Sequence, residues 1–222
     1  SGHELTIMGY QAGYNVTTAD NNIIMGYQAG YNLTSARYNV LIGDQAGYSL
    51  TTTSGNNENV FIGNAAGMFA DASTVDARYN VYVGSGAGRY IDDGHSSVII
   101  GKEAGKSNSA GGNATQYDVF IGHKAGFSAT DTYRSIVIGN EAGYTMTNAP
   151  ESVIIGDQAG YTLTTTTKTV LIGRAAGFNI NATGAEGTVA IGYQAANALT
   201  SAAGLTAVGY QAAKSMVDGH SN

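Results

Sequence analysis

The feature that most constrains the fold is an internal repeat of about 17 residues. Phrases such as TIMGYQAG, VLIGDQAG and VIIGDQAG recur along the whole chain, and in each a mostly apolar triplet precedes a glycine. These twelve anchor glycines are Gly9, Gly26, Gly43, Gly63, Gly84, Gly101, Gly122, Gly139, Gly156, Gly173, Gly192 and Gly209. Seven of the eleven spacings between them are 17 residues, and the others are 19, 20, 21 and 21. A fixed minimum spacing with occasional insertions indicates a coiled chain, because each coil must close and extra residues bulge outward as loops.

Each repeat has room for two short strands and two corners, but not for a helix pair or a four-stranded propeller blade. The triplet is rich in Val and Ile, which favours a strand. A small polar residue such as Asn22 or Asn39 precedes it, and the anchor glycine permits a bend after it. We therefore predict an all-β protein, a parallel β-solenoid of about twelve coils of 17–21 residues, forming a single domain over residues 1–222. The alanine-rich stretch 193–216 could also form a helix, but the repeat continues through it, so we assign it to the solenoid.

A second strand is predicted shortly after each anchor glycine. An alanine stands three residues after every anchor, and Tyr, Phe or Met stands five after it in eight coils. By the period of two, we expect this fifth position and the apolar seventh position to share one face of that strand. The fifth-position residues are Tyr14, Tyr31, Tyr48, Met68, Phe127, Tyr144, Tyr161 and Phe178. Core or interface packing explains this row better than sugar stacking, because Met and Phe replace Tyr.

The strand triplet has no polar side, which is unusual for a strand at a protein surface. We expect its first and third residues to fill the coil interior and its middle residue to point outward. The predicted outward stripe comprises Ile7, Ile24, Leu41, Phe61, Tyr82, Ile99, Phe120, Val137, Ile154 and Leu171. Soluble monomers rarely expose so long an apolar row, so we predict that it is an interface between copies of this chain. The alternatives are that the facing is inverted or that one coil interior buries both faces.

These motifs support a resemblance that covers essentially the whole chain. The pattern small-polar, Val, x, Ile, Gly resembles the head repeat of YadA-like trimeric autotransporter adhesins. Longer phrases such as NVLIGDQAGYSLTTT resemble the IGxQAG arrays of bacteriophage tail fibres. The resemblance implies a left-handed β-roll, an intertwined or side-by-side homotrimer, and a role in adhesion or receptor binding. The chain departs from the adhesin pattern in having Ala-Gly where that repeat often has Ser.

Composition argues against several classes of function. Charged residues make up only 12% of the chain and the net charge is −6, so a nucleic-acid partner is not expected. No apolar run approaches the ~18 residues of a membrane span, so membrane insertion is not expected either. The four histidines occupy different repeat positions and the acids are scattered, and there is no cysteine. We therefore predict no catalytic site, no metal site and no cofactor, and hence a protein that is not an enzyme.

Four corners are longer than the rest, and recognition concentrates on loops held by a rigid scaffold. They span residues 54–59, 71–80, 107–117 and 181–187. The candidate receptor-binding residues are Asn56, Asn57, Asp71, Asp76, Arg78, Asn108, Asn113, Gln116, Asn181 and Glu186. The first three corners each precede an aromatic middle residue of a triplet, which suggests that a wider coil and a longer corner are coupled.

The sequence thus predicts an excerpt of a longer structural and adhesive fibre, because both ends stop within a repeat. The favoured interpretation is a phage tail fibre or related injection-machine fibre at the virion surface or outside the cell. It would bind itself and a cell-surface glycan or protein receptor, and its repeated loops would act through avidity. The alternatives are the head of a bacterial surface adhesin and a multivalent carbohydrate-binding lectin.

Overall fold

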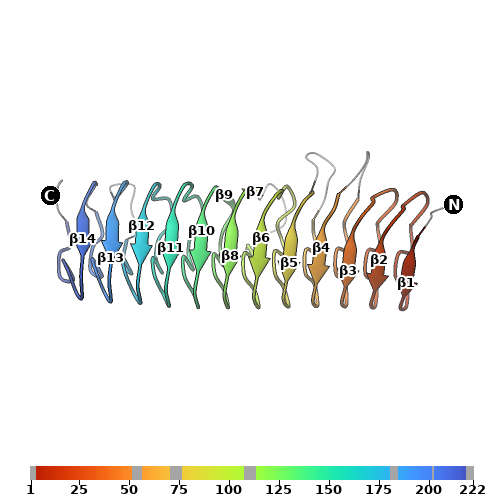
Figure 1. Cartoon of the computed structure of the whole chain (residues 1–222), viewed down its shortest axis with the longest axis horizontal. Coiled ribbons are helices and arrows are strands. Elements are labelled where there is room, and N and C mark those ends of the chain that lie inside the picture. Colours follow the sequence, from red (N-terminus) through yellow and green to blue (C-terminus); the bar gives the residue numbers. More distant parts are fainter. Residues whose placement is uncertain are drawn as a thin grey trace.

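The computed structural model is an elongated stack of coils with the two termini at opposite ends (Figure 1). It describes residues 4–51, 57–70, 77–107, 114–180, 185–201 and 203–218. All regular elements in these ranges are strands of three residues. The all-β parallel solenoid predicted from the repeat is therefore confirmed, with about 11 turns.

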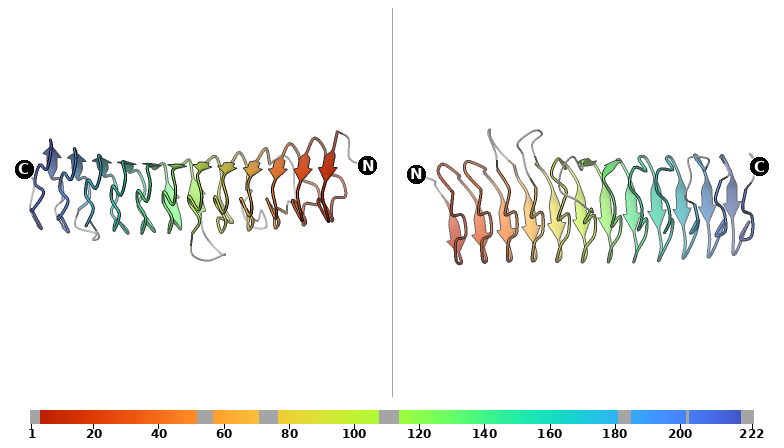
Figure 2. Two further views of the ribbon diagram at one scale, coloured as in Figure 1. Left: turned by 90° about the horizontal axis from the view of Figure 1, so that it is seen from below. Right: turned by 180° about the vertical axis from the view of Figure 1, so that it is seen from behind.

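The strand triplets form one 12-stranded parallel sheet in sequence order along the stack (Figures 1 and 2). Its strands are β1 (Thr6–Met8), β2 (Ile23–Met25), β3 (Val40–Ile42), β4 (Val60–Ile62), β5 (Val81–Val83), β6 (Val98–Ile100), β8 (Val119–Ile121), β10 (Ile136–Ile138), β11 (Val153–Ile155), β12 (Val170–Ile172), β13 (Val189–Ile191) and β14 (Thr206–Val208). Each residue pairs with the residue at the same repeat position in the next coil, as Ile24 does with Leu41. The repeat in the sequence is therefore the register of the sheet, and the alanine-rich stretch keeps it.

The predicted second strand is wrong in its position. Within the described residues, each anchor glycine is followed by a run of turns and not by a strand. The cause is local, because Gln45 and Gly47, two and four residues after their anchor, adopt left-handed backbone with φ of 55° and 59°. Position five is consequently more exposed than position seven, as Tyr31 and Leu33 illustrate, so the two do not share a face.

A second, two-stranded parallel sheet lies before the triplets of two central coils. It consists of β7 (Ala114–Gln116) and β9 (Asp131–Tyr133). Isolated parallel bridges continue it to His95 and from His95 to Arg78. The extra extended pairing thus occurs in the part of the stack that carries the longer corner 107–117.

The predicted facing of the triplets is also wrong. The nine middle residues from Ile24 to Leu171 are at most 1% exposed within the single chain, so they fill the coil interior and form no outward stripe. These corrected residues are Ile24, Leu41, Phe61, Tyr82, Ile99, Phe120, Val137, Ile154 and Leu171. Ile7, in the first described coil, is 43% exposed. Side chains two residues apart on a strand point to the same side. Asn22, two residues before Ile24, is also fully buried, so both side chains point into the coil.

The small polar residues before the triplets form a buried hydrogen-bonded ladder. The backbone N–H of Asn39 donates to Asn22 Oδ1 at 2.8 Å, and that of Asn59 donates to Asn39 Oδ1 at 3.0 Å. The side-chain amide of Asn59 in turn donates to the carbonyl of Ala77 at 2.8 Å. Each buried amide is therefore satisfied by its neighbours, as burial of polar groups requires. The ladder continues from Asn22 to Thr169 and so holds one end of each triplet strand from β2 to β12 in place.

In several coils, paired substitutions balance the volume of the interior. The buried middle residue and the residue seven after the anchor meet inside one coil, as Leu171 and Ile180 do beside Gly177. Two phenylalanines occur with a small partner: Phe61 with Ala70 and Phe120 with Ala129. The coil of Tyr82 departs from this pattern, because its seventh-position residue is the buried Ile91. Where the middle residue is small, the partner is larger, as in Ala190 with Leu199. Close packing of this kind leaves little tolerance for independent change.

Candidate functional sites

The outward side of the triplets is an apolar surface that runs the length of the sheet. We call it the outer strand face. It is formed by the first triplet residues Thr6, Ile23, Val40, Val60, Val81, Val98, Val119, Ile136, Val153, Val170, Val189 and Thr206, and by the third residues Met8, Met25, Ile42, Ile62, Val83, Ile100, Ile121, Ile138, Ile155, Ile172, Ile191 and Val208. Only two of these side chains are polar, both of them threonine, and none is charged.

All residues of the outer strand face are partly or fully exposed in the single chain. With a strand spacing of about 4.8 Å, twelve strands extend roughly 53 Å, and a face two side chains wide covers on the order of 500 Å². Patches of this size on soluble proteins are commonly functional. The residues that directly follow the anchor glycines lie along one flank of this face. They include Tyr10, Asp44, Lys102 and Arg174, all of which are exposed. An apolar centre with a polar rim is the usual anatomy of a protein interface.

The fifth-position aromatic side chains form two stacked ladders on another side of the coils. Tyr14, Tyr31 and Tyr48 stack with ring centroids 5.1 Å apart and interplanar angles of 4° and 9°. The second ladder, from Phe127 through Tyr144 and Tyr161 to Phe178, has centroids 5.0 Å apart. Because each ring covers the face of the next, the ladders present edges and hydroxyls to solvent. This arrangement supports packing, and not sugar stacking, as the role of the row.

The predicted loop residues fall into three groups. Asn56, Asp71, Asp76, Asn108, Asn113 and Asn181 lie outside the described residues. Asn57 is only 2% exposed, and its amide donates to the Ala77 carbonyl at 3.0 Å, so its assignment to an exposed recognition loop is wrong. Its side-chain amide donates to the same Ala77 carbonyl as that of the ladder residue Asn59, which draws it into the interior of the stack.

The remaining three predicted loop residues are at the surface. Glu186 is exposed and pairs with Lys168 at 3.3 Å. Arg78 is exposed, with its guanidinium 5.8 Å from the centre of the Tyr79 ring. Gln116 is half-buried on β7, where it lines a cavity that the repeat pattern does not predict.

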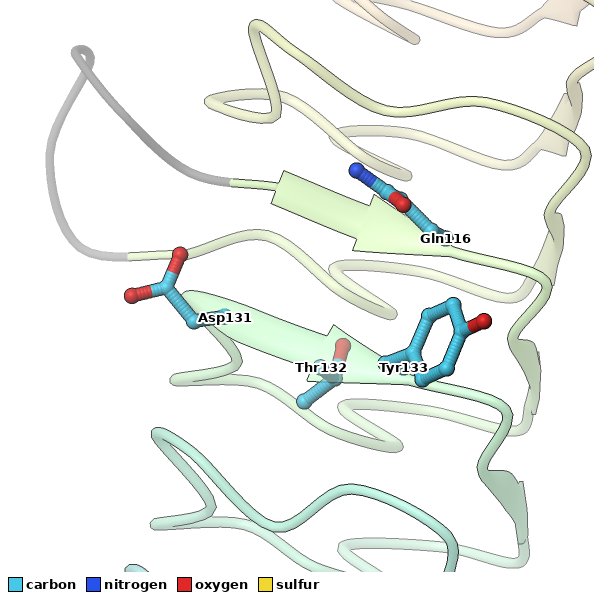
Figure 3. A pocket seen from close by; sticks show the side chains of 4 residues that line it. All are labelled: Gln116, Asp131, Thr132 and Tyr133. Carbon is cyan, nitrogen blue, oxygen red and sulfur yellow. The ribbon is translucent and has the colours of Figure 1, made fainter.

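The cavity at β7 and β9 has a volume of about 250 Å³ and is lined by Gln116, Asp131, Thr132 and Tyr133 (Figure 3). We call it the corner pocket. Gln116 pairs in register with Tyr133, and Asp131 is two residues before Tyr133, so these three side chains share the outward side of the small sheet. Thr132 alternates inward and is 2% exposed. The three outward residues come from two adjacent coils, and only the stacking of those coils brings them together.

Aromatic and basic side chains surround this corner. The guanidinium of Arg134 lies 4.4 Å from the centre of the Tyr133 ring. The Tyr117 ring packs edge-on against Tyr133, with centroids 5.8 Å apart, and also against His95 at 5.0 Å. The ring of Tyr133 is thereby fixed beside the pocket.

A buried carboxylate stands behind the wall of the corner pocket. Asp118 occupies the ladder position that is Asn in four earlier coils and Ser in the preceding one, and it is itself fully buried. Its Oδ2 accepts hydrogen bonds from Thr132 Oγ1 at 2.8 Å and from the Gln116 backbone N–H at 3.1 Å. Burial raises the pKa of Asp118 to about 6, although these hydrogen bonds oppose the shift. Asp118 thus ties both strands of the pocket to the ladder.

The described part of the chain offers no group of three His, Asp or Glu side chains arranged to hold a metal ion. Nor does that part contain a helix that is long and apolar enough to cross a membrane. Comparison of the chain with protein-family models, with curated proteins and with solved structures finds no match. The outer strand face and the corner pocket are therefore the two candidate sites for a function.

Proposed function

We propose that this chain is a segment of a structural and adhesive fibre that self-associates along its outer strand face. The observation that carries the proposal is the length and uniformity of that face, with no charge at any of its positions on twelve consecutive strands. Burying a Val or Ile side chain contributes about 1.5–3 kcal/mol, so even partial burial of these rows favours assembly strongly.

A second copy of the chain is the partner that fits this surface best. The occupant must present apolar groups at the strand spacing of about 4.8 Å over roughly 53 Å, and the same face on another copy does so. With the exposed flanking side chains included, the face approaches the roughly 800 Å² per partner of a stable interface. The resemblance of the repeat to tail-fibre and trimeric-adhesin arrays favours three chains around a common axis.

Adhesion is the second part of the proposed function. A stiff stack repeats its corners at regular intervals, and several chains side by side multiply them, so weak individual contacts can give strong attachment. A tail fibre or related injection-machine fibre, acting outside the cell, uses a protein in this way, and so does the head of a surface adhesin. The proposal covers both, and identification of the genes beside this one separates them.

Light scattering of the purified chain tests self-association. The monomer mass is 22.7 kDa, and we expect a particle of about three times this mass. The variant Ile62→Lys/Val83→Lys/Ile100→Lys places three ammonium groups on adjacent strands of the outer strand face and should give monomers. The matched control is Asn148→Lys/Thr165→Lys, which places lysines at exposed corner positions of two adjacent coils, away from the outer strand face and its flanking row, and should remain assembled. A monomeric wild-type chain would overturn the proposal.

A further inference from the structure

We infer that the corner pocket is a binding site for a single saccharide residue, held by Asp131, Gln116 and Tyr133. The inference depends on the proposed adhesive function and names the ligand class of that function. It is drawn from the shape of the cavity and from the free polar groups at its wall, and it concerns one place in the stack, not the repeated corners in general.

The size of the pocket suits one sugar ring. Its volume of about 250 Å³ is below the roughly 300–1,000 Å³ of sites for drug-sized ligands. A hexopyranose fills such a space, whereas a peptide segment or a nucleotide needs a longer groove. Among the described residues the lining contains no aliphatic side chain of the kind that receives a peptide anchor.

The polar groups of the pocket match the hydroxyls of a sugar. A carboxylate accepts hydrogen bonds at two oxygens, and a carboxamide both donates and accepts. Asp131 is exposed and Gln116 is half-buried, and neither side chain has a hydrogen-bond or ion-pair partner within the described residues. Figure 3 shows the carboxylate and the amide on neighbouring strands beside the same space. Asp131 is opposite Ala114, two residues before Gln116, so the two groups lie toward different ends of the pocket and can bind hydroxyls on different parts of one ring.

Tyr133 supplies the apolar contact that sugar recognition also requires. A pyranose has C–H groups that pack on an aromatic ring, and Tyr couples such a surface to a hydroxyl. This ring is not part of the stacked ladders, whose faces are covered by their neighbours. Its position is fixed by Arg134 and Tyr117, so little side-chain entropy is lost on binding.

The wall behind the ligand is rigid for a separate reason. The buried carboxylate of Asp118 accepts hydrogen bonds from Thr132 on β9 and from the backbone of Gln116 on β7. Both strands are therefore anchored to the interior ladder through one residue. A preformed wall lets weak hydrogen bonds contribute to affinity without a cost of ordering.

Saturation-transfer difference NMR with methyl glycosides of glucose, galactose, mannose and N-acetylglucosamine tests the inference on the assembled protein. We expect saturation transfer to at least one glycoside, with Asp131→Ala and Gln116→Ala each weakening binding by about tenfold. The matched control is Asn148→Ala, at the same repeat position as Asp131 in the next coil, and it should bind as the wild type does.

Two results would overturn the inference. One is the absence of saturation transfer from all four glycosides, and the other is binding that survives both pocket substitutions. Circular dichroism shows whether each variant retains its fold, and light scattering shows whether it remains assembled. An assembled protein that binds no glycoside contradicts the saccharide site alone, whereas a monomeric chain contradicts the proposed function.

Discussion

The carboxylate of Asp118 accepts a hydrogen bond of 2.7 Å from the backbone N–H of Ser135 in the next coil. Asn80 makes the equivalent bond to Ser97 through its amide oxygen at 3.1 Å. The ladder thus continues through a residue that can be charged. An ionised carboxylate in the interior is costly even when it is hydrogen-bonded, and this cost appears as the raised pKa of Asp118.

Asp118 should make the stability of the protein depend on pH. Its pKa is about 6 in the folded chain against an ordinary value of 3.8, so the folded state holds the proton more tightly than the unfolded state. The stabilisation is complete below about pH 4 and is lost as the pH rises through 6. Between pH 4 and pH 8, the wild type should therefore lose about 3 kcal/mol of unfolding free energy relative to Asp118→Asn.

Urea unfolding of both proteins at several pH values measures this difference, because the other carboxylates contribute equally to both and cancel. Asn80→Ser, which changes an uncharged residue of the same ladder, is the control and should give a nearly constant difference. Parallel curves for wild type and Asp118→Asn would contradict the burial of a titrating group at this position.

Gly156 and Gly173 show why the anchor position is glycine. Gly156 has φ of +136°, and a Cβ there would lie 2.5 Å from the carbonyl oxygen of Gly173 in the next coil. Gly156→Ala should therefore destabilise the stack by about 3 kcal/mol or more, through backbone strain and backbone overlap together. Gly187→Ala isolates the strain, since φ is +74° but the nearest atom to a Cβ is 4.0 Å away. We expect a loss of about 1 kcal/mol there, and thermal unfolding that ranks the two variants equally would refute the overlap.

The pairing of Phe120 with Ala129 predicts a compensating double substitution. Both side chains are fully buried. Ala129→Leu alone should overpack the coil and cost about 1–3 kcal/mol, and Phe120→Leu alone should leave a cavity at a similar cost. Together they recreate the interior of the coil that contains Leu41 and Leu50, so the double variant should recover most of the lost stability. A double-mutant cycle of unfolding free energies with no coupling would show that the two side chains do not share one volume.

The sequence was sufficient to predict the solenoid, because a fixed spacing of anchor glycines specifies a closed coil and its register. It was insufficient for the facing of the triplet, since Val, Leu and Ile suit either side of a strand. The deciding signal was present in Asn22 and Asn39. As corner residues, Asn22 and Asn39 do not indicate which side of the strand is buried. As members of a buried ladder they do, because each lies two residues before Ile24 or Leu41 and so on the same side of the strand, which places Ile24 and Leu41 in the interior.

The corner pocket could not be predicted in the same way. Gln116 was recognised because it lies in a long corner, but Asp131 and Tyr133 belong to a coil of ordinary length. Their proximity follows from the pairing of β7 with β9, which joins residues of two different coils. Repeat periodicity specifies the positions that all coils share, and it carries no information about a small sheet that is confined to a few central coils.

The ladder Phe127–Tyr144–Tyr161–Phe178 should contribute measurably to stability although its members are partly exposed. Tyr144 stacks between two rings, with centroids 5.0 Å away on each side. Tyr144→Leu keeps an apolar side chain but removes both ring pairs, so we expect a loss of about 1–3 kcal/mol in urea unfolding. Tyr10→Leu is the control, because Tyr10 stacks on Tyr27 alone at 5.6 Å and is 66% exposed, and it should cost less than about 1 kcal/mol. Equal losses for both variants would mean that the stacking adds nothing beyond the burial of single rings.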